Sequence, residues 1–142
     1  MEPTYTLDEI VNLIAKKSGC DILEINADSD ISNDLGCWGD DFHELIDEYA
    51  LNFKVDMSSY LWYFHTEEEG YNSVGGSFFK PPNERVKHIP VTPQVLLDCA
   101  NNGKWNIAYP PHALPKRRYD VLINQIVVLL FIAFGVYTCV KK

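Results

Sequence analysis

Apolar residues recur with the spacing of an α-helix near the N-terminus and again after residue 40. The first stripe follows Thr6-Leu-Asp-Glu9, which has the pattern of a capping box, and it ends before Gly19. We therefore predict a first helix over residues 7–18. A second helix is predicted from about residue 40 to about residue 53, with its acidic residues off an apolar stripe formed by Phe42, Leu45, Ile46, Tyr49, Ala50 and Phe53.

A third, shorter helix is predicted after Thr92. Thr92 suits an N-cap, Pro93 suits the first helical position, and Gly103 suits the residue that ends the helix. Long segments without a helical period separate the three helices. The first of them, residues 19–39, is predicted to be a loop that packs across the helices.

Two later segments also lack a clear period. Residues 55–64 fit either a short helix or an extended stretch, and residues 66–90 are predicted to be a loop or weak hairpin insert because they are polar and contain Gly and Pro. Aromatic side chains bury roughly 150–250 Å² each, so those of the first segment favour a core over the alternative of a ligand groove. They are Tyr60, Trp62, Tyr63 and Phe64.

The C-terminal stretch 121–140 is twenty residues long and carries no charge. A helix of that length spans roughly 30 Å, the thickness of a bilayer hydrocarbon core. We therefore predict a mainly all-α protein: a helical domain in residues 1–105, a basic linker in residues 106–118, and a transmembrane helix in residues 119–140. The polar Asn124 and Gln125 lie near the start of this helix.

The flanks of the span predict its orientation. Lys116, Arg117 and Arg118 precede it, whereas Lys141 and Lys142 follow it, and basic residues favour the cytoplasmic side. The N-terminus has no basic region followed by a long apolar run, so it does not have the pattern of a secretory signal. We expect a single-pass protein of the inner (cytoplasmic) membrane whose N-terminal domain is cytoplasmic.

The charge of the chain is divided between its two parts. Residues 1–115 hold 19 of the 20 acidic residues and 7 of the 12 basic residues. Nucleic-acid binding depends on clustered Lys and Arg, so we expect no nucleic-acid partner. The four cysteines form no CxxC pair, which excludes a zinc ribbon or a thioredoxin-type motif.

Part of the chain resembles acyl carrier proteins. The matching features are Asp34-Leu35-Gly36, then Asp40-Asp41-Phe42, then a helix that ends in Phe53-Lys-Val55. The stretch 39–45, with Tyr63-Phe64 and residues 92–105, is similar to one bacterial family of carrier-like proteins, domain of unknown function 1493. The resemblance implies a small helical bundle recognised by partners through its second helix.

One position departs from the carrier pattern. The resemblance places Asp41 where a carrier has the serine that bears phosphopantetheine, and a carboxylate cannot form that phosphodiester. We therefore expect no cofactor. Ser29, after Asp28, is the alternative attachment site, although Gly36 and Gly39 leave no room for a long helix after it.

Other candidate chemistry is weaker. Residues 28–39 begin like a calcium loop but lack the glycine and the glutamate that such a loop requires, so we expect no metal site. Cys37, His43 and Asp47 have residue types that a nucleophilic site uses, but no oxyanion hole or pocket is evident, and we expect no enzyme activity. His65, before three glutamates, is interpreted as a solvated loop residue.

The remaining candidate is the acidic second helix with the loop tryptophan before it. Residues 21–70 hold 14 acidic residues and one basic residue, which favours encounter with a basic protein surface. We expect a non-enzymatic, carrier-like interaction module at the membrane. A true carrier using another serine and a toxin-immunity protein are the alternatives; the oligomeric state stays open. The predicted contact residues are Trp38, Asp40, Asp41, Glu44, Asp47 and Glu48.

Overall fold

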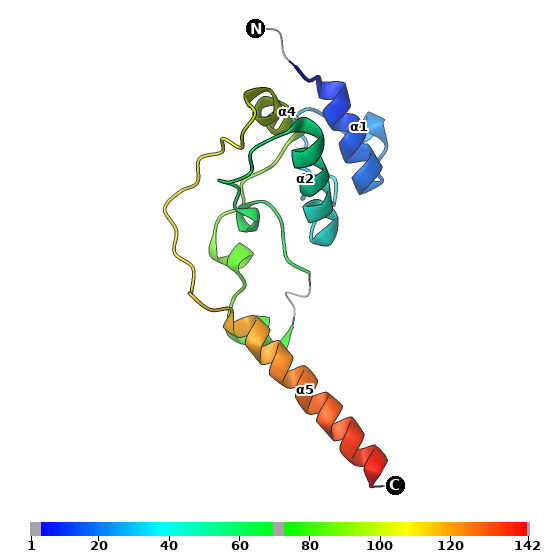
Figure 1. The fold of residues 1–142 in the computed structure, drawn as a ribbon, viewed down its shortest axis with the longest axis vertical. Helices are drawn as coiled ribbons and strands as arrows, with labels where there is room; N and C mark the ends of the chain where they lie inside the picture. Colours follow the sequence, from blue (N-terminus) through cyan, green and yellow to red (C-terminus); the bar gives the residue numbers. More distant parts are fainter. Residues whose placement is uncertain (1–3, 70–72, 142) are drawn as a thin grey trace.

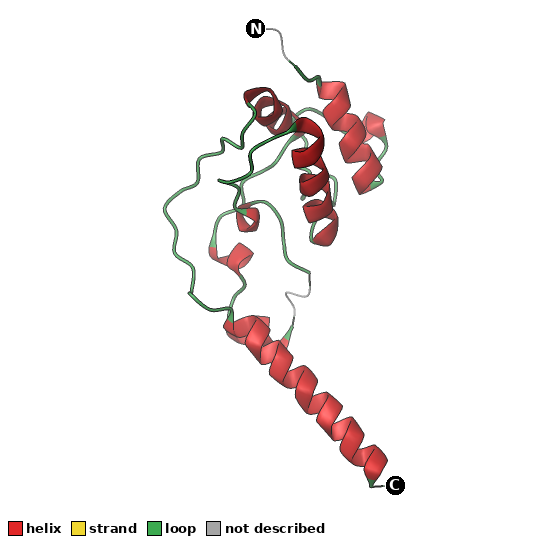
Figure 2. Cartoon of the chain, in the orientation of Figure 1, coloured by secondary structure: helices red, strands yellow, loops and turns green. Residues whose placement is uncertain are grey.

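The computed structural model describes residues 4–69 and 73–141. It contains five α-helices, and over those ranges it has no β-strand; an isolated parallel bridge joins Asp56 to Lys104. Figures 1 and 2 show a bundle at one end of the molecule and a single long helix that projects from the other. The helices are α1 (Leu7–Ser18), α2 (Asp40–Phe53), α3 (Val74–Phe78), α4 (Pro93–Asn102) and α5 (Tyr119–Val140).

The start of α1 confirms the predicted capping box. The Thr6 hydroxyl accepts a hydrogen bond from the Glu9 N–H at 3.4 Å, and the Glu9 carboxylate accepts one from the Thr6 N–H at 2.7 Å. Gly19 ends the helix in the left-handed conformation. These local bonds satisfy backbone groups that a helix end leaves free, which explains why the bounds of α1 follow from the sequence.

The core lies where α1 packs against both α2 and α4 (Figure 1). The apolar stripes of α1 and α2 are buried, as their periodicity predicts. The Tyr49 hydroxyl donates a hydrogen bond to the Leu96 carbonyl at 2.6 Å, which ties α2 to α4 inside the core. Burying an unbonded hydroxyl is costly, so this bond helps to fix the relative position of the two helices.

The loop of residues 19–39 packs across the bundle, as predicted. It contains a short 3₁₀ turn at Ile22–Glu24, and its Ile25, Ile31 and Cys37 side chains join the core. The Ile31 N–H donates to the Val91 carbonyl at 2.9 Å. The loop is therefore held to the segment that leads into α4, and it brings residue 39 to the start of α2.

His65 is fully buried, so its interpretation as a solvated loop residue is wrong. Its Nδ1 donates to the Ile89 carbonyl at 2.8 Å, since a carbonyl can only accept, and its Nε2 accepts from the Tyr109 hydroxyl at 2.8 Å. Burial lowers the pKa of His65 to about 4, so the imidazole is neutral near pH 7. The Tyr109 oxygen in turn accepts hydrogen bonds from the Trp105 Nε1–H and the Leu61 N–H.

The aromatic segment 55–64 forms part of this core, including the 3₁₀ turn Trp62–Phe64. Phe64 is buried, and Tyr60 is stacked on His65 with 5.6 Å between ring centroids. Residues 104–109, which follow α4, return across the segment and supply Trp105 and Tyr109. The core interpretation of these aromatic residues therefore fits better than the groove.

The sequence predicts a loop or weak hairpin over residues 66–90, but the segment contains α3 and a 3₁₀ turn at Pro82–Arg85. α3 has five residues, too few for an apolar period to be visible, and two of them are glycines with poor helix propensity. The helix lies against the start of α5 (Figure 1), where a Cβ on Gly75 would overlap the Asp120 backbone oxygen. Packing on α5, rather than local propensity, therefore stabilises α3.

α5 has 22 residues, about 33 Å at 1.5 Å per residue, and is long and apolar enough to cross a membrane. Most of its large apolar side chains are exposed, and the rest of the described chain covers little of it. In a soluble protein such a surface would be costly to leave in water. The extent of the helix matches the predicted 119–140 segment.

Candidate functional site

Gly39 sets the geometry between Trp38 and α2. Its φ of 61° is in the left-handed region that favours glycine, and a Cβ there would also overlap the Glu69 side chain. Its N–H donates to the Thr66 hydroxyl at 3.1 Å. The turn therefore begins α2 beside the segment 65–69 and leaves Trp38 outside the core with 46% of its surface exposed.

The acidic side chains of α2 lie on the face opposite its buried stripe. Asp40, Asp41, Glu44 and Asp47 are exposed, whereas Glu48 is half-buried. Within residues 4–69 and 73–141, Asp40, Asp41 and Asp47 form no ion pair. The carboxylates at the first turn are favourably placed near the positive end of the helix dipole.

The other two carboxylates interact with the last turn of α1. Lys16 and Lys17 lie 2.9 Å and 2.8 Å from Glu48, and Lys17 lies 3.8 Å from Glu44. Hydrogen bonds from Lys17 and Lys16 lower the pKa of Glu48 to about 2. The acidic face therefore has two parts: Glu44 and Glu48 connect α2 to α1, while Asp40, Asp41 and Asp47 are exposed to solvent.

Cys37, the nucleophile candidate before α2, is a buried thiol. The thiol is 2% exposed, and burial together with the nearby Asp41 carboxylate raises its pKa to about 11. The His43 ring contacts the edge of Trp62, with 5.6 Å between ring centroids. The structure thus gives Cys37 the protonated, buried state of a core residue.

Residues 28–39, which begin like a calcium loop, form hydrogen bonds with one another and with a later segment of the chain. The Asp30 carboxylate is buried and accepts hydrogen bonds from the Asn33 side chain at 3.0 Å and from His88 Nε2 at 2.6 Å. In the part of the chain that the structure describes, no group of acidic, histidine or cysteine residues is arranged to hold a metal ion. These bonds connect the loop 19–39 to the segment before α4.

Comparison with protein families gives a match to one model, described as "Protein of unknown function (DUF1493)", over residues 6–108. The chain belongs to the DUF1493 family. No curated protein and no solved structure matches it. The DUF1493 region begins at the N-cap of α1 and ends just before Tyr109, so it contains the acidic face and the aromatic core apart from Tyr109, but not α5.

The sequence reasoning missed the residues that join the DUF1493 region to α5. The Arg118 guanidinium contacts the carboxylates of Glu68, at 2.7 Å, and Asp120. The Asn124 side chain accepts a hydrogen bond from the Gly75 N–H and donates one to the Ser73 hydroxyl, each at 2.8 Å. A polar residue inside an apolar span was the available signal, since such a residue needs a partner.

Proposed function

We propose that this DUF1493 protein is a non-enzymatic, acyl-carrier-like interaction module that binds a basic protein surface through the exposed face of α2. The observation that carries the proposal is the placement of Asp40, Asp41 and Asp47 on one exposed helix face beside the half-exposed Trp38. Exposed carboxylates without intramolecular partners attract a basic surface over a distance, and a tryptophan adds apolar contact area at close range.

The carrier likeness explains why α2 is the recognition element. Asp41 is the second residue of α2, the place where the resemblance puts the serine of a carrier. A carboxylate there supplies charge to the interface but offers no hydroxyl for a phosphodiester. In this proposal the chain keeps the recognition helix of a carrier and lacks the prosthetic arm.

The alternative carrier site does not fit this geometry. Ser29 is only 8% exposed, and its hydroxyl accepts a hydrogen bond from the Asn26 N–H at 3.0 Å. A transferase would need that hydroxyl free and accessible. The intact mass of the full-length protein, after co-expression with a phosphopantetheinyl transferase, should show no phosphopantetheine adduct; an adduct would restore the carrier function.

The proposal also places the module at a membrane. α5 is long and apolar enough to span one, and three basic residues precede it. We propose that α5 anchors the protein in the bacterial inner membrane with α1–α4 on the cytoplasmic side. Carbonate-washed membranes should retain the full-length protein, whereas release by carbonate would contradict the anchor.

The partner is tested by capture from detergent-solubilised membranes, with mass spectrometry of what binds to the full-length protein. The double variant Asp41→Lys/Asp47→Lys reverses two exposed charges of the face. We expect it to lose a partner that the wild type captures, and that partner should have a basic surface. Capture should also weaken as salt rises, because exposed charges are screened beyond about 8 Å at physiological ionic strength.

The matched control is Asp8→Lys/Asp98→Lys. Asp8 is the second residue of α1, as Asp41 is of α2, so both variants make the same change near a helix N-terminus and the same change in net charge. Asp98 is an exposed acid of α4. Equal loss of the partner in both double variants would mean that net charge, not the α2 face, decides binding, and the proposed function would fail.

A further inference from the structure

Exposed aromatic residues surround the start of α5. Phe78 and Phe79, at the end of α3, are 74% and 42% exposed, and Tyr119, the first residue of α5, is 44% exposed. The rings of Phe79 and Tyr119 are in contact, with 5.4 Å between their centroids. α3 therefore adds its aromatic side chains at the level where α5 begins, although the two segments are far apart in sequence.

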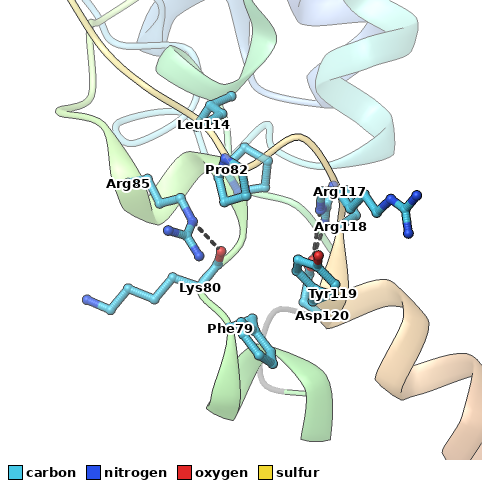
Figure 3. Close-up of a pocket in the computed structure, with 10 residues that line it drawn as sticks. Phe79, Lys80, Pro82, Arg85, Leu114, Arg117, Arg118, Tyr119 and Asp120 are labelled. Carbon is cyan, nitrogen blue, oxygen red and sulfur yellow. Dashed lines mark hydrogen bonds and ion pairs between the residues drawn. The ribbon is translucent and has the colours of Figure 1, made fainter.

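Basic side chains lie at the same level. A small cavity of about 70 Å³ opens between the end of α3, the 3₁₀ turn at 82–85 and the start of α5, and Lys80, Arg85 and Arg117 line it (Figure 3). Asp120 is the acidic residue of the lining, and its carboxylate already contacts Arg118. In the described chain, Lys80, Arg85 and Arg117 have no acidic partner within ion-pair distance.

This positive site contrasts with the rest of the body. Residues 1–115 carry 19 acidic and 7 basic residues, so an anionic surface repels most of the body. Lys80, Arg85 and Arg117 nevertheless all lie where the body meets the apolar helix. We name the six residues the interfacial collar: Phe78, Phe79, Lys80, Arg85, Arg117 and Tyr119.

The combination selects one ligand class. Tyrosine favours the level of lipid headgroups, and phenylalanine suits the apolar boundary of the acyl chains. Lysine and arginine near an anionic leaflet contribute about 1 kcal/mol each, or roughly fivefold in affinity. A soluble anion would use the cations but not the exposed rings. A protein partner would have to reach these residues at the bilayer surface, where lipid is already present and where the exposed rings are suited to contact it.

We propose that the interfacial collar binds the headgroup of an anionic phospholipid in the leaflet nearest the body. The phosphate lies against Arg85, with Lys80 and Arg117 on either side of the cavity as further positive charge (Figure 3), and the acyl chains follow the exposed surface of α5 beside Phe78 and Tyr119. The proposal rests on the membrane anchor of the proposed function, but not on the α2 face.

The test uses the full-length protein in a neutral detergent, titrated with phosphatidylglycerol or phosphatidylcholine and followed by native mass spectrometry. The wild type should bind phosphatidylglycerol at least tenfold more tightly than phosphatidylcholine. The variant Lys80→Gln/Arg117→Gln should lose roughly 25-fold in affinity for phosphatidylglycerol, about fivefold for each cation removed, and change little toward phosphatidylcholine. Arg85 is kept because its Nε–H donates to the Lys80 carbonyl at 2.7 Å and holds the turn.

The matched control is Lys104→Gln/Lys141→Gln, which removes the same charge from the body and from the far end of α5. Its affinity for phosphatidylglycerol should stay within twofold of the wild type. Equal losses in the two double variants, or no preference between the two lipids, would overturn the proposal. Circular dichroism should be the same for all three proteins, because every substituted side chain is outside the core.

A competition arm separates the lipid from a soluble anion. Glycerophosphoglycerol, the headgroup without acyl chains, should not displace phosphatidylglycerol at equal concentration; displacement would mean a soluble-anion site and would contradict the lipid. Carbonate extraction of the wild type tests the membrane anchor separately: release of the protein by carbonate would contradict the anchor. A protein that carbonate does not release but that shows no lipid preference contradicts only the collar.

Discussion

The Asn124 side chain, in the second turn of α5, accepts a hydrogen bond from the Gly75 N–H at 2.8 Å. Asn124 also donates to the Ser73 hydroxyl at 2.8 Å, so a single amide satisfies two groups at the start of α3. Asn124 of the apolar α5 therefore forms its hydrogen bonds within the chain. The sequence alone left open whether this residue pairs with the span of a second copy. This contact joins the body to α5 at a point separate from the linker.

The first prediction compares Asn124→Leu with Gln125→Leu. Both variants remove an amide from α5, but Gln125 is exposed and forms no side-chain hydrogen bond in the described chain. Asn124→Leu loses two hydrogen bonds, each worth about 1 kcal/mol, so amide hydrogen exchange of residues 73–79 should be roughly 25-fold faster in this variant alone. Equal exchange in the two variants would show that Asn124 does not hold α3.

The second prediction concerns the close approach of α3 to α5. A methyl group at Gly75 would overlap the Asp120 backbone oxygen, so Gly75→Ala should displace α3 at a cost of about 1–3 kcal/mol. Chymotrypsin should then cut faster after the exposed Phe78. Gly135→Ala is the control, since a Cβ there meets open space; faster cutting in this control, or none in Gly75→Ala, would contradict the contact.

The third prediction separates the two faces of α2. Leu45 is fully buried, and Leu45→Ala should reduce the free energy of unfolding by about 2–5 kcal/mol. Glu44→Ala should cost less than about 1 kcal/mol, because the ion pair that Glu44 forms in the described chain is the exposed one with Lys17. Urea denaturation in mild detergent, followed by tryptophan fluorescence, measures both. Similar values at the two positions would mean that the faces are misassigned.

The fourth prediction concerns pH. The pKa of His65 falls from an ordinary value of 6.5 to about 4 in the folded protein, because the ring is buried. The unfolded chain therefore binds this proton first, and stability that is fully present above pH 6.5 is lost as pH falls toward 4. The loss is roughly 3 kcal/mol at 1.36 kcal/mol for each pH unit.

The measurement for this fourth prediction is the free energy of unfolding between pH 7.5 and pH 4, in the wild type and in His65→Gln. The variant has no imidazole, so its profile should be flatter by the contribution of His65. Parallel profiles would mean that other groups account for the acid sensitivity. The carboxylates common to both proteins cancel in the difference.

Much of the bundle could be predicted because its signals are local. Thr6, Gly19 and Thr92 determine helix ends through bonds to residues at most four positions away, and the stripes of α1 and α2 repeat over several turns. α3 and His65 could not be predicted in this way. The stability of α3 comes from Asn124, about fifty positions later, and the surroundings of His65 come from Ile89 and Tyr109.

The candidate site also has features that local sequence patterns predict and features that depend on residues far apart in the chain. Helical periodicity places Asp40, Asp41 and Asp47 on the exposed face of α2, as the structure has them. Which acids are free depends on the distance from α1, and the sequence alone does not show that Lys16 and Lys17 pair with Glu48. The interfacial collar needs a fold in which residues 78–85 meet residues 117–119, which no local pattern indicates.

The two separate attachments of α5 have a consequence for how the protein would search for a partner. A domain tethered by one flexible chain sweeps a wide volume above the bilayer and turns in every direction. Here the linker and α3 both hold α5, so the body tilts over a narrower range relative to the membrane normal than a single tether would allow. For a chain anchored as proposed, the exposed edge of α2 then varies less in its height above the lipid. Encounter becomes a two-dimensional problem of lateral diffusion and rotation about one axis.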